Sequence, residues 1–138
     1  MRTLPMFVAS CAWLGVVHGQ AQTAWISPAG GAWENPAAWS AGLPQATQLT
    51  VTIANAGSKT VVVSAATPAP QLALPRVELS APVGATNTLY FDRLASRPVT
   101  FADSFVIGAG GLAVVEDSTL DFDGAGGAAL TVEAGSLR

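Results

Sequence analysis

The sequence predicts an all-β protein, a short β-solenoid that begins with a Trp-rich cap. Beyond residue 24, apolar residues alternate with polar ones or form short β-branched runs, and no helical periodicity is found. Glycine runs and prolines interrupt these segments at short intervals, as corners between strands require. Two segments near the C-terminus also resemble each other, which is typical of stacked coils. A β-sandwich with similar turns is the alternative fold.

Residues 1–21 have the three parts of a secretory signal peptide. Arg2 precedes an apolar run over residues 4–17, and small or polar residues follow at 18–23. A membrane-spanning helix needs about 20 apolar residues, so this run is too short to be an anchor. We therefore expect residues 1–21 to be removed, by cleavage after Ala21 or after Gly19. The mature chain, which carries no transmembrane segment, would be exported to the extracellular space or the outer cell surface.

The composition of the mature chain excludes several classes of function. The one cysteine and the one histidine, Cys11 and His18, both lie in the leader. Their removal leaves no disulfide, no thiolate nucleophile, no Ser-His-Asp triad and no Cys or His metal ligand. Residues 22–138 have five cations against nine carboxylates, 5 − 9 = −4, and no basic cluster, which argues against nucleic-acid binding. We expect no cofactor, no metal and no catalytic residue.

Strands are expected from residue 49 onward. Residues 49–53 alternate, with Leu49, Val51 and Ile53 on one face. Residues 55–59 have the composition of a turn, and residues 60–64 form a β-branched strand. This pair is either a hairpin or two successive edges of one solenoid coil.

The later strands are shorter and more often interrupted. Pro68, Pro70 and Pro75 restrict residues 71–74 to a short or edge strand. Further short strands are expected at residues 76–80, 88–91, 99–101 and 112–115.

The C-terminal third repeats itself. Residues 113–120 align with residues 130–137, an offset of 130 − 113 = 17, and each copy lies beside a Gly-Ala-Gly-Gly run, at 108–111 and 124–127. In stacked coils, each rung buries its apolar face only against its neighbours, and such repeats are their sequence signature.

Residues 25–44 carry three of the four tryptophans in the pattern Trp, Gly-Gly, Trp-x-Asn-Pro-x-x-Trp-Ser-x-Gly-x-Pro. This segment resembles the opening of exported proteins with autotransporter-associated β-strand repeats and of related PEP-CTERM-sorted surface proteins. The resemblance covers the leader, residues 25–65 and, more loosely, the repeats up to Arg138. It implies a right-handed parallel β-solenoid, secreted or surface-exposed, with no catalytic residues to carry over.

The resemblance also organises the chain into a signal peptide (1–21), a Trp/Gly/Pro-rich N-terminal cap (22–48) and a β-strand repeat region (49–138). Two features of those proteins are missing, a translocating C-terminal β-barrel and a C-terminal sorting helix. The last residues also stop inside a repeat, so we expect the repeat region to be incomplete.

The tryptophan cluster allows two interpretations. Trp25, Trp33 and Trp39 pack over the open first coil as a cap, their large rings covering the face that has no neighbouring coil. Alternatively, Trp33 and Trp39 are exposed and form glycan contacts, because indole faces stack on sugar rings. The position near the start of the repeats favours the cap.

The densest acidic patch is Glu116, Asp117, Asp121 and Asp123. Paired carboxylates serve glycoside hydrolysis, but this patch lacks the cations or neighbouring carboxylate ladder that such chemistry would use. Residues 121–126 only partly match a calcium loop, since Ala125 and Val132 stand where ligands belong. We therefore expect a non-enzymatic surface protein of structural or adhesive role, with surface polysaccharide or its own strand edges as partners. The alternative function is a carbohydrate-binding module that uses Trp33 and Trp39.

Overall fold

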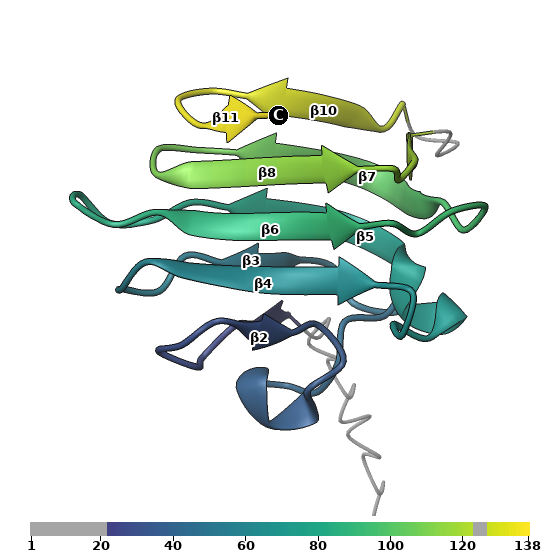
Figure 1. Cartoon of the computed structure of the whole chain (residues 1–138), viewed down its shortest axis with the longest axis horizontal. Coiled ribbons are helices and arrows are strands. Elements are labelled where there is room, and N and C mark those ends of the chain that lie inside the picture. The colour runs from purple at the N-terminus through teal and green to yellow at the C-terminus, as the bar shows by residue number, and fades with distance from the viewer. Residues whose placement is uncertain (1–21, 123–126) are drawn as a thin grey trace, which may run out of the picture.

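The computed structural model describes residues 22–122 and 127–138, in which the chain winds through about four turns of a parallel β-solenoid (Figure 1). Successive strands alternate between two sheets, except that β9 and β10 both belong to the first, and the named strands all pair in parallel. The predicted solenoid is therefore confirmed over the β-sandwich, and the segments at 51–53 and 59–64 are edges of one coil, not a hairpin. The predicted signal peptide, residues 1–21, lies outside the described residues.

The first sheet has the order β1-β3-β5-β7-β10, and β9 also pairs with β7. The second sheet has the order β11-β8-β6-β4-β2. The strands of the first sheet are β1 (Thr23–Ala24), β3 (Val51–Ile53), β5 (Ala73–Leu79), β7 (Val99–Ile107), β9 (Leu120–Asp121) and β10 (Ala129–Val132). Those of the second are β2 (Gly31–Ala32), β4 (Lys59–Ser64), β6 (Asn87–Asp92), β8 (Gly111–Glu116) and β11 (Ser136–Leu137). Two short 3-10 helices, η1 (Pro36–Ala38) and η2 (Ala69–Leu72), lie between strands.

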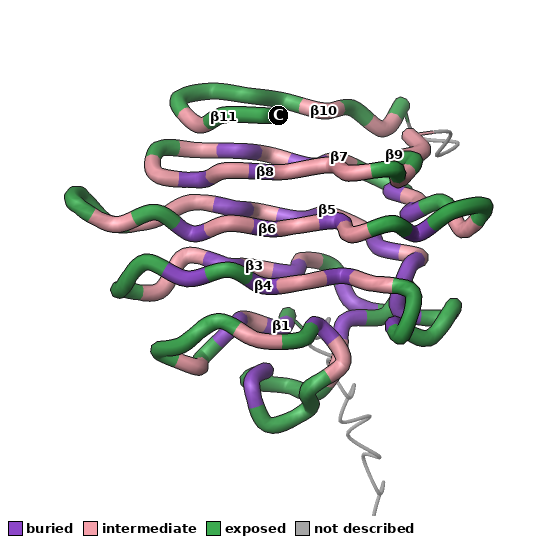
Figure 2. The backbone as a smooth tube through the Cα atoms, viewed as in Figure 1, coloured by how far each residue is buried: buried purple, intermediate pink, exposed green. Residues whose placement is uncertain are grey.

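The core fills the space between the two sheets. Because strand side chains alternate in direction, every second residue points inward, and the parallel register stacks these residues in columns. The columns of the two sheets belong to one hydrophobic core, and their members are at most 1 % exposed. Figure 2 shows buried positions recurring along the strands of both sheets. They are Val51, Val77 and Phe105; Ile53, Leu79 and Ile107; Val61, Leu89 and Ala113; Val63 and Phe91.

The coil is longer than the sequence repeat indicated. Val51 pairs with Val77 and Val77 with Phe105, so the residue number rises by 77 − 51 = 26 and then by 105 − 77 = 28. From Phe105 to its partner Leu130 it rises by 130 − 105 = 25. The predicted offset of 17 is therefore wrong as a coil length. It aligns β8 with β10, strands of opposite sheets that share the same alternation and the same preceding glycine run.

Glycine does mark the corners, as predicted. Gly57, Gly84 and Gly110 have φ of 84°, 84° and 71°, and each lies in a turn that leads from the first sheet to the second. This left-handed conformation strains any residue with a Cβ atom, which explains why glycine recurs at equivalent points of successive turns.

Two local predictions are wrong. Leu49 is 44 % exposed and precedes β3, so the inward alternation begins only at Val51. Pro75 does not end a strand, because β5 runs through it from Ala73 to Leu79. The pairing of β5 with β7 shifts register between Leu74 and Arg76. An irregularity of this kind tolerates the missing proline N–H, which a regular ladder does not.

Candidate functional site

The tryptophans of the predicted cap lie at the first turn of the solenoid. Trp25 follows Ala24, which pairs with Thr52, and Trp33 follows Ala32, which pairs with Val62. Both indoles therefore take the inward positions one turn before Ile53 and Val63. Trp39 packs edge-to-face against both, with ring centroids 5.1 Å from Trp25 and 4.8 Å from Trp33.

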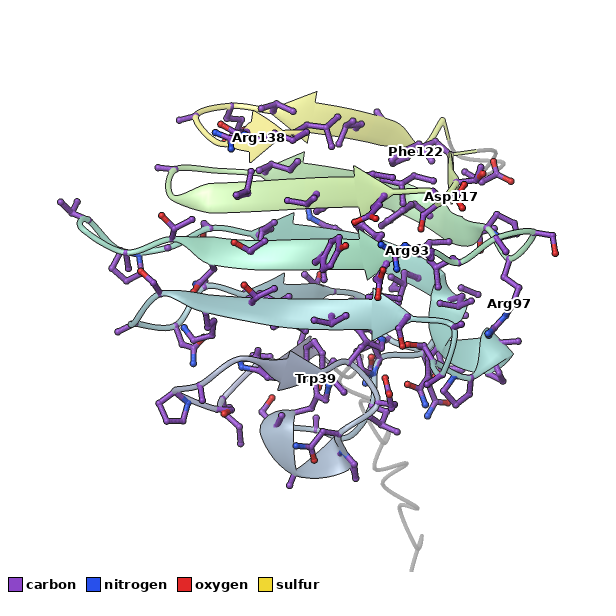
Figure 3. All side chains as sticks on the ribbon, in the orientation of Figure 1. Trp39, Arg93, Arg97, Asp117, Phe122 and Arg138 are labelled. Carbon is purple, nitrogen blue, oxygen red and sulfur yellow. The ribbon has the colours of Figure 1, made fainter. Side chains whose placement is uncertain are left out.

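Trp39 is held in this place by the short helix η1 that precedes it. The side chain of Asn35 accepts a hydrogen bond from the Ala37 N–H at the start of η1, and Pro36 occupies the first helical position. The Trp39 Nε1–H then donates to the Trp33 carbonyl oxygen over 2.8 Å. Figure 3 shows Trp39 at the end of the stack opposite Arg138.

The burial of these rings decides between the two interpretations of the cluster. Trp25, Trp33 and Trp39 are 2 %, 0 % and 3 % exposed. A ring without a free face cannot stack on a sugar, so the geometry supports the cap and corrects the expectation of glycan contacts at Trp33 and Trp39.

A different cluster of polar residues lies on the outer face of the second sheet. We call the outward residues of β4, β6 and β8 the Tyr90 face. Three columns run across the three strands on this face: Thr60, Thr88 and Leu112; Val62, Tyr90 and Val114; Ser64, Asp92 and Glu116. Adjacent members of a column are about 4.8 Å apart, the spacing of paired strands. The face therefore has an apolar central stripe with carboxylates along one side and hydroxyls along the other.

Tyr90 is tied to the carboxylates beside it. Its hydroxyl donates to Glu116 Oε2 on the next strand and lies 3.5 Å from Asp92 Oδ1. The Arg93 guanidinium donates to Glu116 Oε1 from Nη2 at 2.6 Å and from Nε at 3.1 Å. Arg93 Nε is also 3.9 Å from Asp92 Oδ1. This network links β6 to β8 at the surface.

The network changes the acidity of its members. The hydrogen bond to Glu116, with burial and the nearby Asp92 charge, raises the pKa of Tyr90 to about 12. The hydrogen bonds from Tyr90 and Arg93 lower the pKa of Glu116, and the bond to Glu116 raises the pKa of Arg93. The pKa of each of these three groups is thus shifted further from pH 7.

The backbone at this corner is unusual as well. Arg93 and Asp117 directly follow β6 and β8 and have φ of 48° and 44°, in the left-handed region. For a residue with a side chain this costs about 1–2 kcal/mol. The Ser118 hydroxyl holds the two turns together, since its Oγ accepts from the Leu94 N–H at 3.1 Å and lies 2.8 Å from the Glu116 carbonyl oxygen. Figure 3 places Arg93 and Asp117 at this end of the strands.

Sequence reasoning missed a buried lysine on the inner side of the same sheet. Composition predicts a turn at Lys59, yet this residue begins β4 and points inward, 6 % exposed. Its Nζ donates to the carbonyl oxygens of Asn55, Ala56 and Gly57 at 3.0, 2.9 and 2.6 Å. A fourth oxygen, Asn87 Oδ1, lies 2.9 Å away. The signal was present, because Lys59 continues the alternation of Val61 and Val63.

Asn87 completes this inner corner. It pairs with Lys59 in the register of β4 and β6, and it is fully buried. Its Nδ2 donates to the carbonyl oxygens of Asn55 and Ser80 at 3.0 and 2.7 Å. Burial lowers the pKa of the Lys59 ammonium, although its oxygen partners are well placed to hold the charged form. We interpret Lys59 and Asn87 as structural residues that satisfy the buried carbonyl oxygens at this corner of the coil.

The acidic patch expected near residues 116–123 does not come together as one site. Glu116 belongs to the Tyr90 network, Asp117 follows it in the turn, and Asp121 lies on the first sheet, in β9. Asp123 lies outside the described residues. Within the described ranges, no three His, Cys, Asp or Glu residues are grouped so that they could hold a metal ion. No helix there is long and apolar enough to cross a membrane.

Comparisons with family models, with curated proteins and with solved structures find no match to this chain.

Proposed function

We propose that this chain is an exported β-solenoid of the cell surface or the extracellular space, with a structural and adhesive role and no catalysis. The observation that carries the proposal is the tryptophan cap. Trp25, Trp33 and Trp39 close the first turn immediately after the segment that has the pattern of a signal peptide. Cleavage after Ala21 would therefore release a chain whose first strand, at Thr23, already belongs to a closed coil.

The shape of the molecule supports the structural part of this proposal. A solenoid is a quasi-one-dimensional structure in which each turn contacts only its neighbours, and it presents long regular faces to a partner. The Tyr90 face supports the adhesive part, because it arranges a tyrosine, two carboxylates and a guanidinium on an outward sheet surface.

Association between solenoids through their strand edges is part of the same proposal. In the described residues, β10 and β11 are the last strands of their sheets. Val132 and Leu137, which lie on them, are 45 % and 43 % exposed. A hollow of about 390 Å³ opens between these strands and is lined by Val115, Leu120, Phe122, Leu130, Leu137 and Arg138. An open strand edge pairs readily with another strand, and an apolar hollow beneath it adds burial.

The proposal of export is tested on the full chain, expressed with its leader in a Gram-negative host. Fractionation and intact-mass measurement of the product are expected to find it outside the cytoplasm, starting at Gln20 or Gln22. A double substitution, Leu14→Arg with Val17→Arg, interrupts the apolar run and is expected to keep the chain at full length inside the cell. Recovery of an unprocessed cytoplasmic wild-type chain would overturn the proposal.

A further inference from the structure

We infer that the Tyr90 face is a contact surface for a neutral, hydroxyl-rich glycan. The inference deepens the adhesive role and to that extent rests on the proposed function. It assigns glycan contact to Tyr90, which sequence patterns did not single out, instead of to Trp33 and Trp39, which are buried.

Tyr90 has a position unlike that of the other described aromatic residues. Six of them belong to the core: Trp25, Trp33, Trp39, Phe91, Phe101 and Phe105. Phe122 is partly buried and stacks on Phe101, with centroids 4.8 Å apart and an interplanar angle of 11°. Tyr90 alone among them is an outward residue in the middle of a sheet, half-buried between the strands beside it.

The neighbours of Tyr90 extend its ring into a stripe. Val62 on β4 and Val114 on β8 stand directly beside it in the register of the sheet. All three side chains point away from the core. An aromatic ring flanked by aliphatic groups on a flat sheet offers the C–H face of a sugar ring a continuous apolar support, while the Tyr hydroxyl remains at the edge.

The polar groups beside the stripe match sugar hydroxyls. Asp92 and Glu116 present carboxylate oxygens that accept hydrogen bonds, and Arg93 presents guanidinium N–H groups that donate. The hydroxyls of Thr60 and Thr88, which both donate and accept, lie along the other side. A hydroxyl group on a sugar can satisfy either kind of partner, so a glycan needs no fixed pattern of donors.

The charges at the face select for a neutral ligand. Two carboxylates flank Tyr90, and residues 22–138 carry a formal net charge of 5 − 9 = −4, so an anionic polymer would be repelled. A cationic polymer would compete with Arg93, which already pairs with Glu116 at 2.6 Å. The network ties two turns together, and the packing of Tyr90 between Val62 and Val114 also stabilises the sheet. These three side chains are nevertheless only partly buried, so the stripe stays accessible to a ligand.

The test measures binding of the full exported chain to neutral hexasaccharides of β-linked glucose, N-acetylglucosamine, xylose and mannose by calorimetry. Polygalacturonate and chitosan serve as anionic and cationic probes. Wild type is expected to bind at least one neutral oligosaccharide. Tyr90→Ala is expected to weaken that binding about tenfold or more, and Tyr90→Phe, which keeps the ring, by less than about threefold.

A matched control removes the ion pair on the outer face of the first sheet. Arg76 Nε lies 2.8 Å from Glu78 Oε1, and the double variant Arg76→Ala with Glu78→Ala is expected to bind as wild type does. Circular dichroism checks that each variant is folded. Unchanged affinity in folded Tyr90→Ala, preference for a charged probe, or no binding to the neutral panel would each overturn the inference. Export and processing of the same preparation report separately on the proposed function.

Discussion

At the scale of single residues, the two polar groups that matter most are Lys59 inside the coil and Tyr90 outside it. Each is fixed by partners from other strands or turns: Lys59 by three turn carbonyls and Asn87, Tyr90 by Glu116. Buried polar groups stabilise a fold only when they are fully paired, since an unpaired one keeps its desolvation penalty.

Replacing Lys59 with Met is expected to lower the free energy of unfolding by about 2–4 kcal/mol. The substitution retains an unbranched chain of similar length but removes the donor to the Ala56 and Gly57 carbonyl oxygens and to Asn87 Oδ1. The Asn55 carbonyl oxygen loses one of its two donors and keeps the bond from Asn87 Nδ2. Urea unfolding followed by circular dichroism measures the change, with the outward neighbour Thr60→Val as control. A loss below about 1 kcal/mol for Lys59→Met would contradict the assigned role.

The pKa of Tyr90 can be measured directly, because Tyr90 is the one tyrosine of the chain. Titration of tyrosinate absorbance in the folded protein is expected to give a midpoint at about 12, against an ordinary value of 10.0. Because the folded value is raised, the stabilisation is complete below pH 10 and is lost as pH rises through about 12. Glu116→Gln is expected to move the midpoint back toward 10.0, and an unchanged midpoint would show that Glu116 is not the cause.

At the scale of elements, the sequence predicted strands better than it predicted their limits. The β-branched run at residues 60–64 identified β4 correctly, although the strand begins one residue earlier, at Lys59. Propensity rules predict a break at Pro75, since they cannot foresee that a register shift opposite Phe101 and Ser104 accommodates it. The repeat near the C-terminus gave a wrong coil length for a related reason. Strands of both sheets have the same alternation of apolar residues, and only the strand pairing shows which strands are stacked in one sheet.

The edge formed by β10 is expected to drive association between molecules. Light scattering of the full exported chain should show mass growing with concentration, and Val132→Lys should reduce it by placing a charge on the open edge. Val83→Lys is the control, because Val83 is a fully exposed apolar residue in the turn between β5 and β6. Equal association of folded Val132→Lys and wild type would exclude this edge.

At the scale of the whole molecule, the solenoid and its tryptophan cap were predictable, because both depend on local pattern and position in the chain. The Tyr90 face was not, because its central stripe joins Val62, Tyr90 and Val114, whose numbers differ by 90 − 62 = 28 and by 114 − 90 = 24. Unequal coil lengths hide such a column from any inspection of the sequence alone. The resemblance to autotransporter-associated repeats and PEP-CTERM-sorted proteins stays a prediction.

The cap is expected to stabilise the whole solenoid. Trp39→Ala removes the ring that packs against both Trp25 and Trp33, and truncation of a buried Trp costs about 3–5 kcal/mol. Thermal unfolding should show a large loss of stability and exposure of the remaining indoles to solvent by fluorescence. The control Ile26→Ala changes a side chain that is 55 % exposed beside the cap and should have little effect. A Trp39→Ala protein as stable as wild type would contradict the cap.

The measurement that tests the central claim most directly is thiol labelling on intact cells. In a Cys11→Ser background, Val83→Cys places the single thiol in an exposed turn, and Val77→Cys places it in the core. For an exported, folded solenoid at the cell surface, a membrane-impermeant maleimide labels Val83→Cys on intact cells, or in the medium if the chain is released. Val77→Cys reacts only after denaturation. Labelling of Val83→Cys only after the cells are broken would contradict surface exposure, and equal labelling of both variants in the native state would contradict the solenoid core.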